Sequence, residues 1–169
     1  MTRSSYLASK AVAVVALLAL VTLGPPMLML CAFTLLGQGP DGPSALAQLF
    51  GEMLLGGAVV AALHASLSLA VSSTTTRKAA ASAGIILVLL ASAAVSEALV
   101  DGADAAPELF CTNLLQLPFE LVRRIYGDLN PDPTIAAIPT ATLVAAYTTW
   151  TVLFAAFTWL RYRRVAVDR

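Results

Sequence analysis

Charged side chains are scarce in this sequence. Of its 169 residues, 12% are charged and 59% are hydrophobic, and the mean hydropathy is +0.82. A soluble domain carries about 25% charged residues, and a water-soluble fold of this length cannot bury so much apolar surface. The composition therefore excludes an ordinary soluble protein and predicts a single domain whose helices pack against one another in lipid.

Metal-binding and catalytic patterns are also missing. The chain has one histidine and two cysteines, Cys31 and Cys111, without a CxxC pair, so a Cys/His metal site lacks ligands. Whether the two cysteines form a disulfide or are simply small buried apolar residues stays open. The sequence contains no GxxxxGK[ST] phosphate loop, no GxSxG and no HExxH. We therefore expect neither an enzyme nor a cofactor, and no basic cluster before the C-terminal end indicates nucleic acid.

Four long apolar runs make up most of the chain. They cover residues 11–36, 45–71, 79–100 and 134–160. Each exceeds the roughly 20 residues that cross a hydrocarbon core of about 30 Å, and the first is too long for the apolar part of a signal peptide. Because Pro25 and Pro26 remove two backbone donors from the first run, we expect a kink or a break there. The runs predict an all-α membrane protein with four transmembrane helices.

The basic residues are distributed unevenly between the segments that flank these runs. Eight of the ten precede the first run, follow the second or follow the fourth. They are Arg3, Lys10, Arg77, Lys78, Arg161, Arg163, Arg164 and Arg169. Only Arg123 and Arg124 lie in the other segments. Because Lys and Arg are enriched on the cytoplasmic side, we expect both termini in the cytoplasm of a bacterial-type cytoplasmic membrane, with residues 37–44 and 101–133 outside.

The segment between the third and fourth runs is too polar to span and too apolar for an ordinary loop. Within residues 105–130, five apolar side chains recur at spacings that place them on one helical face. They are Phe110, Leu114, Leu117, Leu121 and Ile125. We expect Pro118 to divide the segment into two short helices and Glu120 to pair with Arg123 or Arg124. The pattern predicts an amphipathic, re-entrant helix pair in the outer leaflet, either a passive cover or an outer gate.

Three ionisable residues interrupt the apolar runs, namely Glu52 and His64 in the second and Glu97 near the outer end of the third. Such residues are functional candidates because a charge in lipid is costly. Glu52 and His64 would lie about 18 Å apart along a helix and about 120° around it, so they cannot form one proton relay. We expect His64 to be neutral and hydrogen-bonded to a neighbouring helix, and structural roles are favoured for all three.

Small residues recur at intervals of four in three of the runs. The rows are Ala58, Ala62, Ser66 and Ala70, then Ala80 and Gly84, then Ala137, Ala141 and Ala145. Such rows let helix backbones approach closely in lipid. They predict helix-packing seams in a compact bundle or a larger assembly.

Four local patterns, taken in order, resemble the membrane-spanning permease subunit of an ABC transporter of the type-2 exporter class. Residues 2–11, TRSSYLASKA, are similar to the start of that family's third span. Residues 67–78, a serine-rich helix end leading into two basic residues, resemble the connection between its fourth and fifth spans. The amphipathic segment 105–130 resembles its re-entrant helices, and residues 159–165, WLRYRRV, resemble its C-terminal end.

The resemblance implies a function that the residues alone do not. It implies the last four of six spans, without the elbow helix, the first two spans and most of the coupling helix. It also implies that a separate ATPase subunit powers export of an unidentified substrate along a path between two permease subunits. Arg3 and Lys10 would lie nearest the ATPase. The alternative is a stand-alone four-helix membrane protein with a structural, accessory or immunity role.

Overall fold

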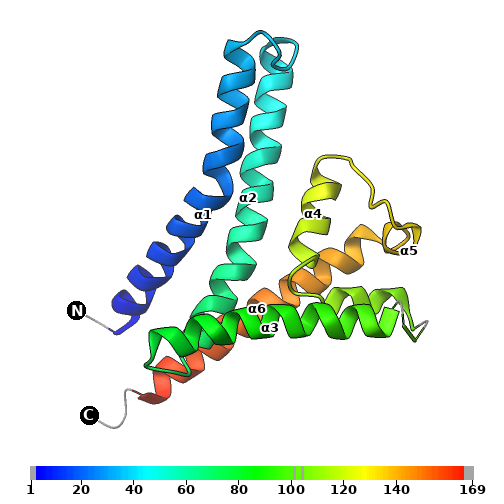
Figure 1. Ribbon diagram of the computed structural model, residues 1–169. Coiled ribbons are helices and arrows are strands. Elements are labelled where there is room, and N and C mark those ends of the chain that lie inside the picture. The colour runs from blue at the N-terminus through cyan, green and yellow to red at the C-terminus, as the bar shows by residue number, and fades with distance from the viewer. Residues whose placement is uncertain (1–2, 101, 104, 166–169) are drawn as a thin grey trace.

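The computed structural model describes residues 3–100, 102–103 and 105–165, and these form helices and connecting turns without any strand (Figure 1). The helices in chain order are α1 (Arg3–Leu35), α2 (Gly42–Ser72), α3 (Lys78–Val100), η1 (Pro107–Thr112), α4 (Leu117–Ile125), α5 (Pro133–Ala136) and α6 (Thr140–Val165). Four of them, α1, α2, α3 and α6, are long and apolar enough to cross a membrane. The prediction of an all-α, multi-pass membrane protein is confirmed.

The molecule has the shape of a V (Figure 1). One arm is the α1–α2 hairpin, the other contains α3 and α6, and α4 lies between the arms. Both ends of the described chain and the turn between α2 and α3 meet where the arms join, which we call the terminal end. The α1–α2 turn and the η1–α5 region lie away from it. The three basic segments thus lie together, whereas the two segments predicted to face outward lie at the ends of different arms (Figure 1).

Helix α2 is the central element of the fold. Half of its membrane-length segment is buried, compared with 6% for α1, 6% for α3 and 11% for α6. It packs against α1, α4, α6 and α3, and Tyr147 of α6 donates a hydrogen bond to the Val59 carbonyl oxygen of α2 over 2.9 Å. The other three spans therefore expose most of their apolar surface to whatever surrounds the protein.

Two adjacent glycines of α2 lie where α1 and α4 pack against it. A Cβ atom on Gly57 would overlap the side chain of Leu23 from α1, and one on Gly56 would lie 3.4 Å from Val122 of α4. The missing side chains let α1 and α4 approach neighbouring positions of α2. Helix α2 thus meets α1 and α4 at a pair of glycines that the predicted rows of small residues did not include.

Helix α1 is continuous through its proline pair. Pro25 and Pro26 both lie inside the helix, and Figure 1 shows its axis changing direction part-way along. Prolines remove two backbone hydrogen bonds but leave the other turns intact, so the expected kink occurs without a break. The hydroxyl of Thr22, one turn earlier, donates to the carbonyl oxygen of Leu18 over 2.9 Å and lies 3.4 Å from that of Gly57.

Two helix ends differ from the predicted positions because proline starts these helices. Pro118 does not divide the η1–α4 segment but lies in the first turn of α4, where no helical N–H partner is required. The division falls at Asn113, whose Oδ1 accepts a hydrogen bond from the Gln116 amide over 3.0 Å. Likewise the fourth span begins at Thr140, not at residue 134, because Pro139 precedes it and α5 is separate.

The rows of small residues are mostly not seams within this chain. Ala137, Ala141 and Ala145 are exposed, so the prediction for the last span is wrong within this chain. Of the α2 row, Ser66 and Ala70 are buried and Ala58 is exposed. In α3, a Cβ on Gly84 would lie 3.0 Å from Val71. Alanines are small wherever they occur, so their spacing alone does not say which helix face has a neighbour.

Candidate functional site

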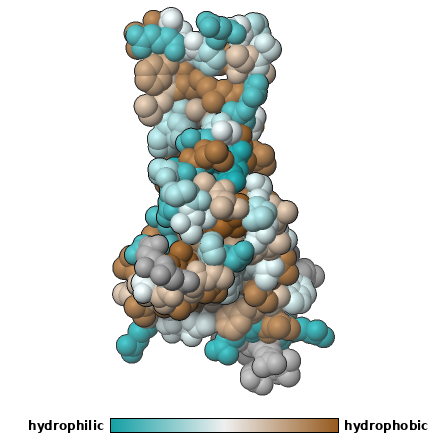
Figure 2. Space-filling view, turned by 90° about the vertical axis from the view of Figure 1, so that its right-hand side faces the viewer, coloured by the Kyte–Doolittle hydropathy of each residue, from teal (hydrophilic) through white to brown (hydrophobic). Residues whose placement is uncertain are grey.

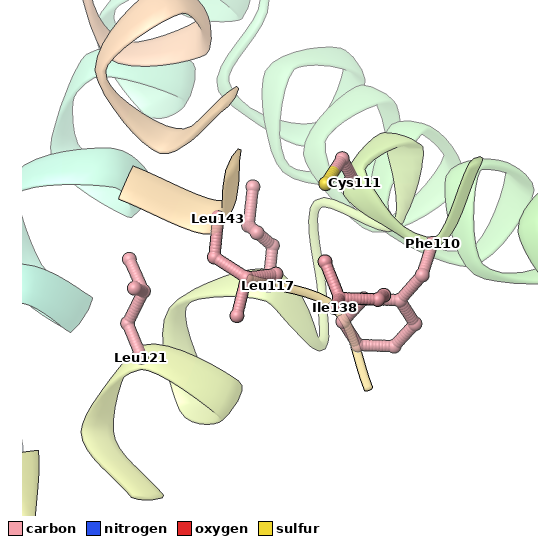
Figure 3. Packing of buried hydrophobic residues seen from close by; sticks show 6 residues of the cluster. All are labelled: Phe110, Cys111, Leu117, Leu121, Ile138 and Leu143. Atoms are coloured by element: carbon pink, nitrogen blue, oxygen red, sulfur yellow. The ribbon is translucent and has the colours of Figure 1, made fainter. Parts of the chain in front are cut away.

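Most of the five predicted gate residues face the interior of the chain. Phe110, Leu114, Leu117 and Leu121 are buried and Ile125 is partly buried. Three of them share a cluster with Cys111, Ile138 and Leu143 (Figure 3). The apolar face that the spacing predicted is therefore real, but it packs on the chain's own helices and not on lipid. Moving η1 and α4 away from Ile138 and Leu143 would expose this cluster.

Two hydrogen bonds attach the η1 region to the long helices of its arm. The indole Nε1 of Trp150 in α6 donates to the Cys111 carbonyl oxygen over 3.0 Å. The Leu114 amide donates to the hydroxyl of Ser92 in α3 over 3.2 Å. Because both bonds are partly buried, they replace hydration that the groups lose on packing. The segment is held on both sides, by α3 and by α6.

A buried ion pair within α4 is hydrogen-bonded to the turn that leads to α5. Arg124 Nε donates to Glu120 Oε1 over 2.9 Å, and Asn130 Nδ2 donates to Glu120 Oε2 over 2.7 Å. Glu120 is only 2% exposed, so an unpaired charge there would be costly, and both carboxylate oxygens have donors. The expected pairing of Glu120 is confirmed for Arg124.

Arg124 also holds the end of α5. Its terminal nitrogen donates to the carbonyl oxygens of Ile135 over 3.2 Å, Ala136 over 3.0 Å and Ile138 over 3.3 Å. These carbonyls lie at and just after the end of a short helix, where a cation is favourable, and the Ile135 carbonyl oxygen also accepts a hydrogen bond from the Ile138 amide over 3.1 Å. The sequence showed the i,i+4 pair but not this second role, because the carbonyls come 11 to 14 residues later.

The three ionisable candidates do not form one site. Glu52 accepts a hydrogen bond from Gln48 one turn away over 2.8 Å. His64 Nδ1 lies 2.8 Å from the Val60 carbonyl oxygen of its own helix. The expected bond to a neighbouring helix is therefore wrong, although the Phe119 ring of α4 lies 6.4 Å away, centroid to centroid. Glu97 is exposed at the other arm.

Two side chains outside the four long helices have a raised pKa. Burial, and then the negative charge of Glu52, raises the pKa of the Tyr126 phenol at the end of α4. Burial, and then the charge of Glu108, raises the pKa of the Cys111 thiol. Both cysteines are free, Cys31 exposed and Cys111 buried, so the open question of a disulfide is answered by two separate thiols.

The terminal end contains a contact between the first and last helices. Lys10 Nζ donates to the Tyr162 hydroxyl over 2.9 Å and lies 5.6 Å from the centre of that ring. Lys10, which the resemblance placed near an ATPase, thus has a partner within the chain. The side chain of Arg3 lies outside the described part of the structure.

A polar cavity of about 290 Å³ opens beside the buried ion pair. Its walls come from the end of α3, from η1 and α4, and from the turn before α5. The lining residues are Ser96, Glu97, Val100, Phe110, Asn113, Gln116, Glu120, Arg123, Asn130 and Ile135. Figure 2 views the molecule from the side of α5 and shows hydrophilic residues at the upper and lower ends and, mixed with apolar ones, across the middle.

No protein-family model, curated protein or solved structure matches this chain. Its function is therefore inferred from the local patterns of its sequence and from the geometry described above.

Proposed function

We propose that this chain is a permease component of an ABC exporter in a bacterial-type cytoplasmic membrane. The observation that carries the proposal is the η1–α4 segment before the last span, in which the η1 region is hydrogen-bonded to the third and fourth spans and α4 packs against α2 and α6. That arrangement is the one expected of re-entrant helices before a last span in this permease class. The four ordered sequence patterns support the same assignment.

The distribution of basic residues supports an orientation with both termini in the cytoplasm. Lys10, Arg77 and Arg161 belong to segments that meet at the terminal end, whereas Arg123 and Arg124 lie at the η1–α4 region (Figure 1). Positive charges are retained on the cytoplasmic side during insertion. In this orientation, η1 and α4 lie at the outer surface.

Cysteine labelling in intact cells tests the orientation. In a background with Cys31→Ser and Cys111→Ser, the variants Asp41→Cys and Asp128→Cys should react with an impermeant thiol reagent. Thr75→Cys should react only after the cells are opened, because its turn lies at the terminal end. The reverse labelling pattern would overturn the orientation.

The exposed spans support a role as one part of an assembly. Helices α1, α3 and α6 bury little of their apolar surface within the chain. In the proposed exporter, lipid and a second permease subunit cover these faces, and a separate ATPase switches the access of the path between the two subunits. The buried apolar face of η1 and α4 serves there as an outer gate.

Copurification tests the assignment directly. The tagged chain, expressed with its genomic neighbours, is expected to retain a nucleotide-binding protein whose ATP hydrolysis depends on the chain. A matched sample with the neighbouring ATPase carrying an inactivated phosphate-binding loop should retain the complex but lose export. Repeated absence of any nucleotide-binding protein from the purified sample would refute the proposal.

The alternative is a stand-alone four-helix membrane protein with a structural, accessory or immunity role. The contact between Lys10 and Tyr162 favours it, because the residue assigned to the ATPase side is engaged within the chain. This alternative predicts an assembly that is stable and active without any ATPase.

A further inference from the structure

The polar cavity beside Glu120 contains hydrogen-bonding groups that the chain itself leaves unused. Ser96 and Asn113 are each only 2% exposed and both line the cavity. Within the described residues, the Ser96 hydroxyl makes no hydrogen bond. Asn113 uses its Oδ1 towards the Gln116 amide and leaves its Nδ2 without a partner.

Because buried polar side chains are almost always hydrogen-bonded, these two groups need a partner from inside the cavity. Among the described residues, no fully enclosed side-chain nitrogen or oxygen lacks a partner. The free groups of Ser96 and Asn113 therefore retain access to the cavity. They are placed to bind a molecule inside it.

The charges around the cavity point to the chemistry of that molecule. Glu120 is paired with Arg124 and accepts a hydrogen bond from Asn130. Glu97 and Arg123 also line the cavity, and neither side chain has an ion-pair partner in the described part of the chain. Among the described residues, the cavity thus presents one unpaired carboxylate and one unpaired guanidinium, which together suit a ligand with one positive and one negative group.

The size of the cavity limits the ligand to a small group. Its volume of about 290 Å³ is at the lower end of the range of about 300 to 1,000 Å³ for ligand pockets. One water takes about 30 Å³ of liquid volume, so the space suits a headgroup and not a whole lipid. On the Glu97 face of α3, Leu90 and Ile86 are exposed, and they offer acyl chains an apolar surface next to the cavity.

We propose that this cavity binds the phosphate–ammonium group of a zwitterionic phospholipid such as a phosphatidylethanolamine. Arg123 binds the phosphate oxygens, for which a guanidinium is the best-suited side chain. Glu97 accepts hydrogen bonds from the ammonium group. Ser96 and Asn113 donate to the remaining phosphate and ester oxygens. The same chemistry occurs in free phosphoethanolamine, and the site does not depend on the chain being an ABC permease.

Lipid binding to the purified full-length chain tests the proposal. The chain is titrated in nanodiscs of phosphatidylcholine containing increasing phosphatidylethanolamine or phosphatidylglycerol, and bound lipid is counted by native mass spectrometry after release. We expect phosphatidylethanolamine to be retained in preference to phosphatidylglycerol. Glu97→Gln and Arg123→Gln should each weaken retention by at least about tenfold, because each removes a charge-assisted hydrogen bond.

Matched variants separate the site from general charge effects. Glu108→Gln removes an exposed carboxylate of the same segment that does not line the cavity, and Arg163→Gln removes an exposed guanidinium at the terminal end. Neither should change retention. Because Glu97 and Arg123 are also exposed, their variants are expected to fold, which circular dichroism checks.

The possible outcomes are distinct. Equal retention of phosphatidylglycerol with no effect of Glu97→Gln would overturn the proposal, because only the attraction of Arg123 for anions would remain. Soluble phosphoethanolamine that competes with the lipid at equal concentration would support the headgroup chemistry but assign it to a free zwitterion. Loss of retention in Glu108→Gln as large as in Glu97→Gln would also refute the site.

Discussion

The ion pair between Glu120 and Arg124 offers the most direct test of how the segment between the third and fourth spans is held. The Glu120 side chain is 1% exposed and that of Arg124 14% exposed. Arg124→Met keeps most of the aliphatic stem but removes the charge and every donor. The variant leaves a buried carboxylate with only Asn130 as a side-chain donor, and three carbonyls at the end of α5 without their cation.

The expected loss is large for one side chain. Breaking a buried pair by removing one partner costs about 3 to 5 kcal/mol, chiefly because the other charge stays buried. Arg123→Met is the matched control, since its neighbouring guanidinium is exposed and unpaired within the described residues, and such a change is usually worth within about 0.5 kcal/mol. Free energies of unfolding from SDS titration in mixed micelles measure both.

A second substitution identifies the cause of the loss. Glu120→Gln in the Arg124→Met background removes the stranded charge, and we expect it to recover about 1 to 3 kcal/mol. Faster hydrogen exchange at residues 133–139 should accompany Arg124→Met alone, because carbonyl oxygens of this segment lose their hydrogen bonds from Arg124. Equal destabilisation by Arg124→Met and Arg123→Met would refute the reasoning.

Two further predictions concern contacts elsewhere. Gly57→Ala should destabilise the α1–α2 hairpin by about 1 to 3 kcal/mol, because the added Cβ meets the Leu23 side chain of α1. The control Gly51→Ala, which has open space around it, should leave stability unchanged. SDS titration measures both, and equal effects would contradict the packing. Burial and the charge of Glu108 raise the pKa of the Cys111 thiol. Glu108→Gln should therefore lower that pKa and speed the alkylation of Cys111 at pH 8, measured in the Cys31→Ser background. An unchanged alkylation rate between pH 7 and 10 would argue against the electrostatic contribution.

Part of the functional region could be predicted because it depends on nearby residues. The spacing of Phe110, Leu117 and Leu121 placed them on one face, and the structure buries that face. Glu120 and Arg124 are one helical turn apart, so their pairing also followed from the spacing. In both cases the relevant partner, or the common face, lies within the same short segment.

Other features could not be predicted because their partners come from distant parts of the chain. The amphipathic face gave no indication of whether it would meet lipid or the core, and Leu143 and Ile138 of the next segments decided this. His64 bonds to the Val60 carbonyl oxygen of its own helix, and only the packing of the neighbouring helices decides which other acceptors lie within its reach. From the sequence, Pro118 could equally separate two helices or lie in the first turn of one, and the structure shows that it lies in the first turn of α4.

The sequence by itself determined that this protein is a set of four membrane-length helices with an amphipathic segment before the last. Hydrophobic runs and helical spacing are local, and every backbone group in lipid must be satisfied within its own helix. Only the tertiary structure decided that α2 is central, that α4 lies between two diverging arms, and that Ser96, Asn113, Glu97 and Arg123 surround one cavity. Those features depend on contacts between residues far apart in the chain, which no local pattern records.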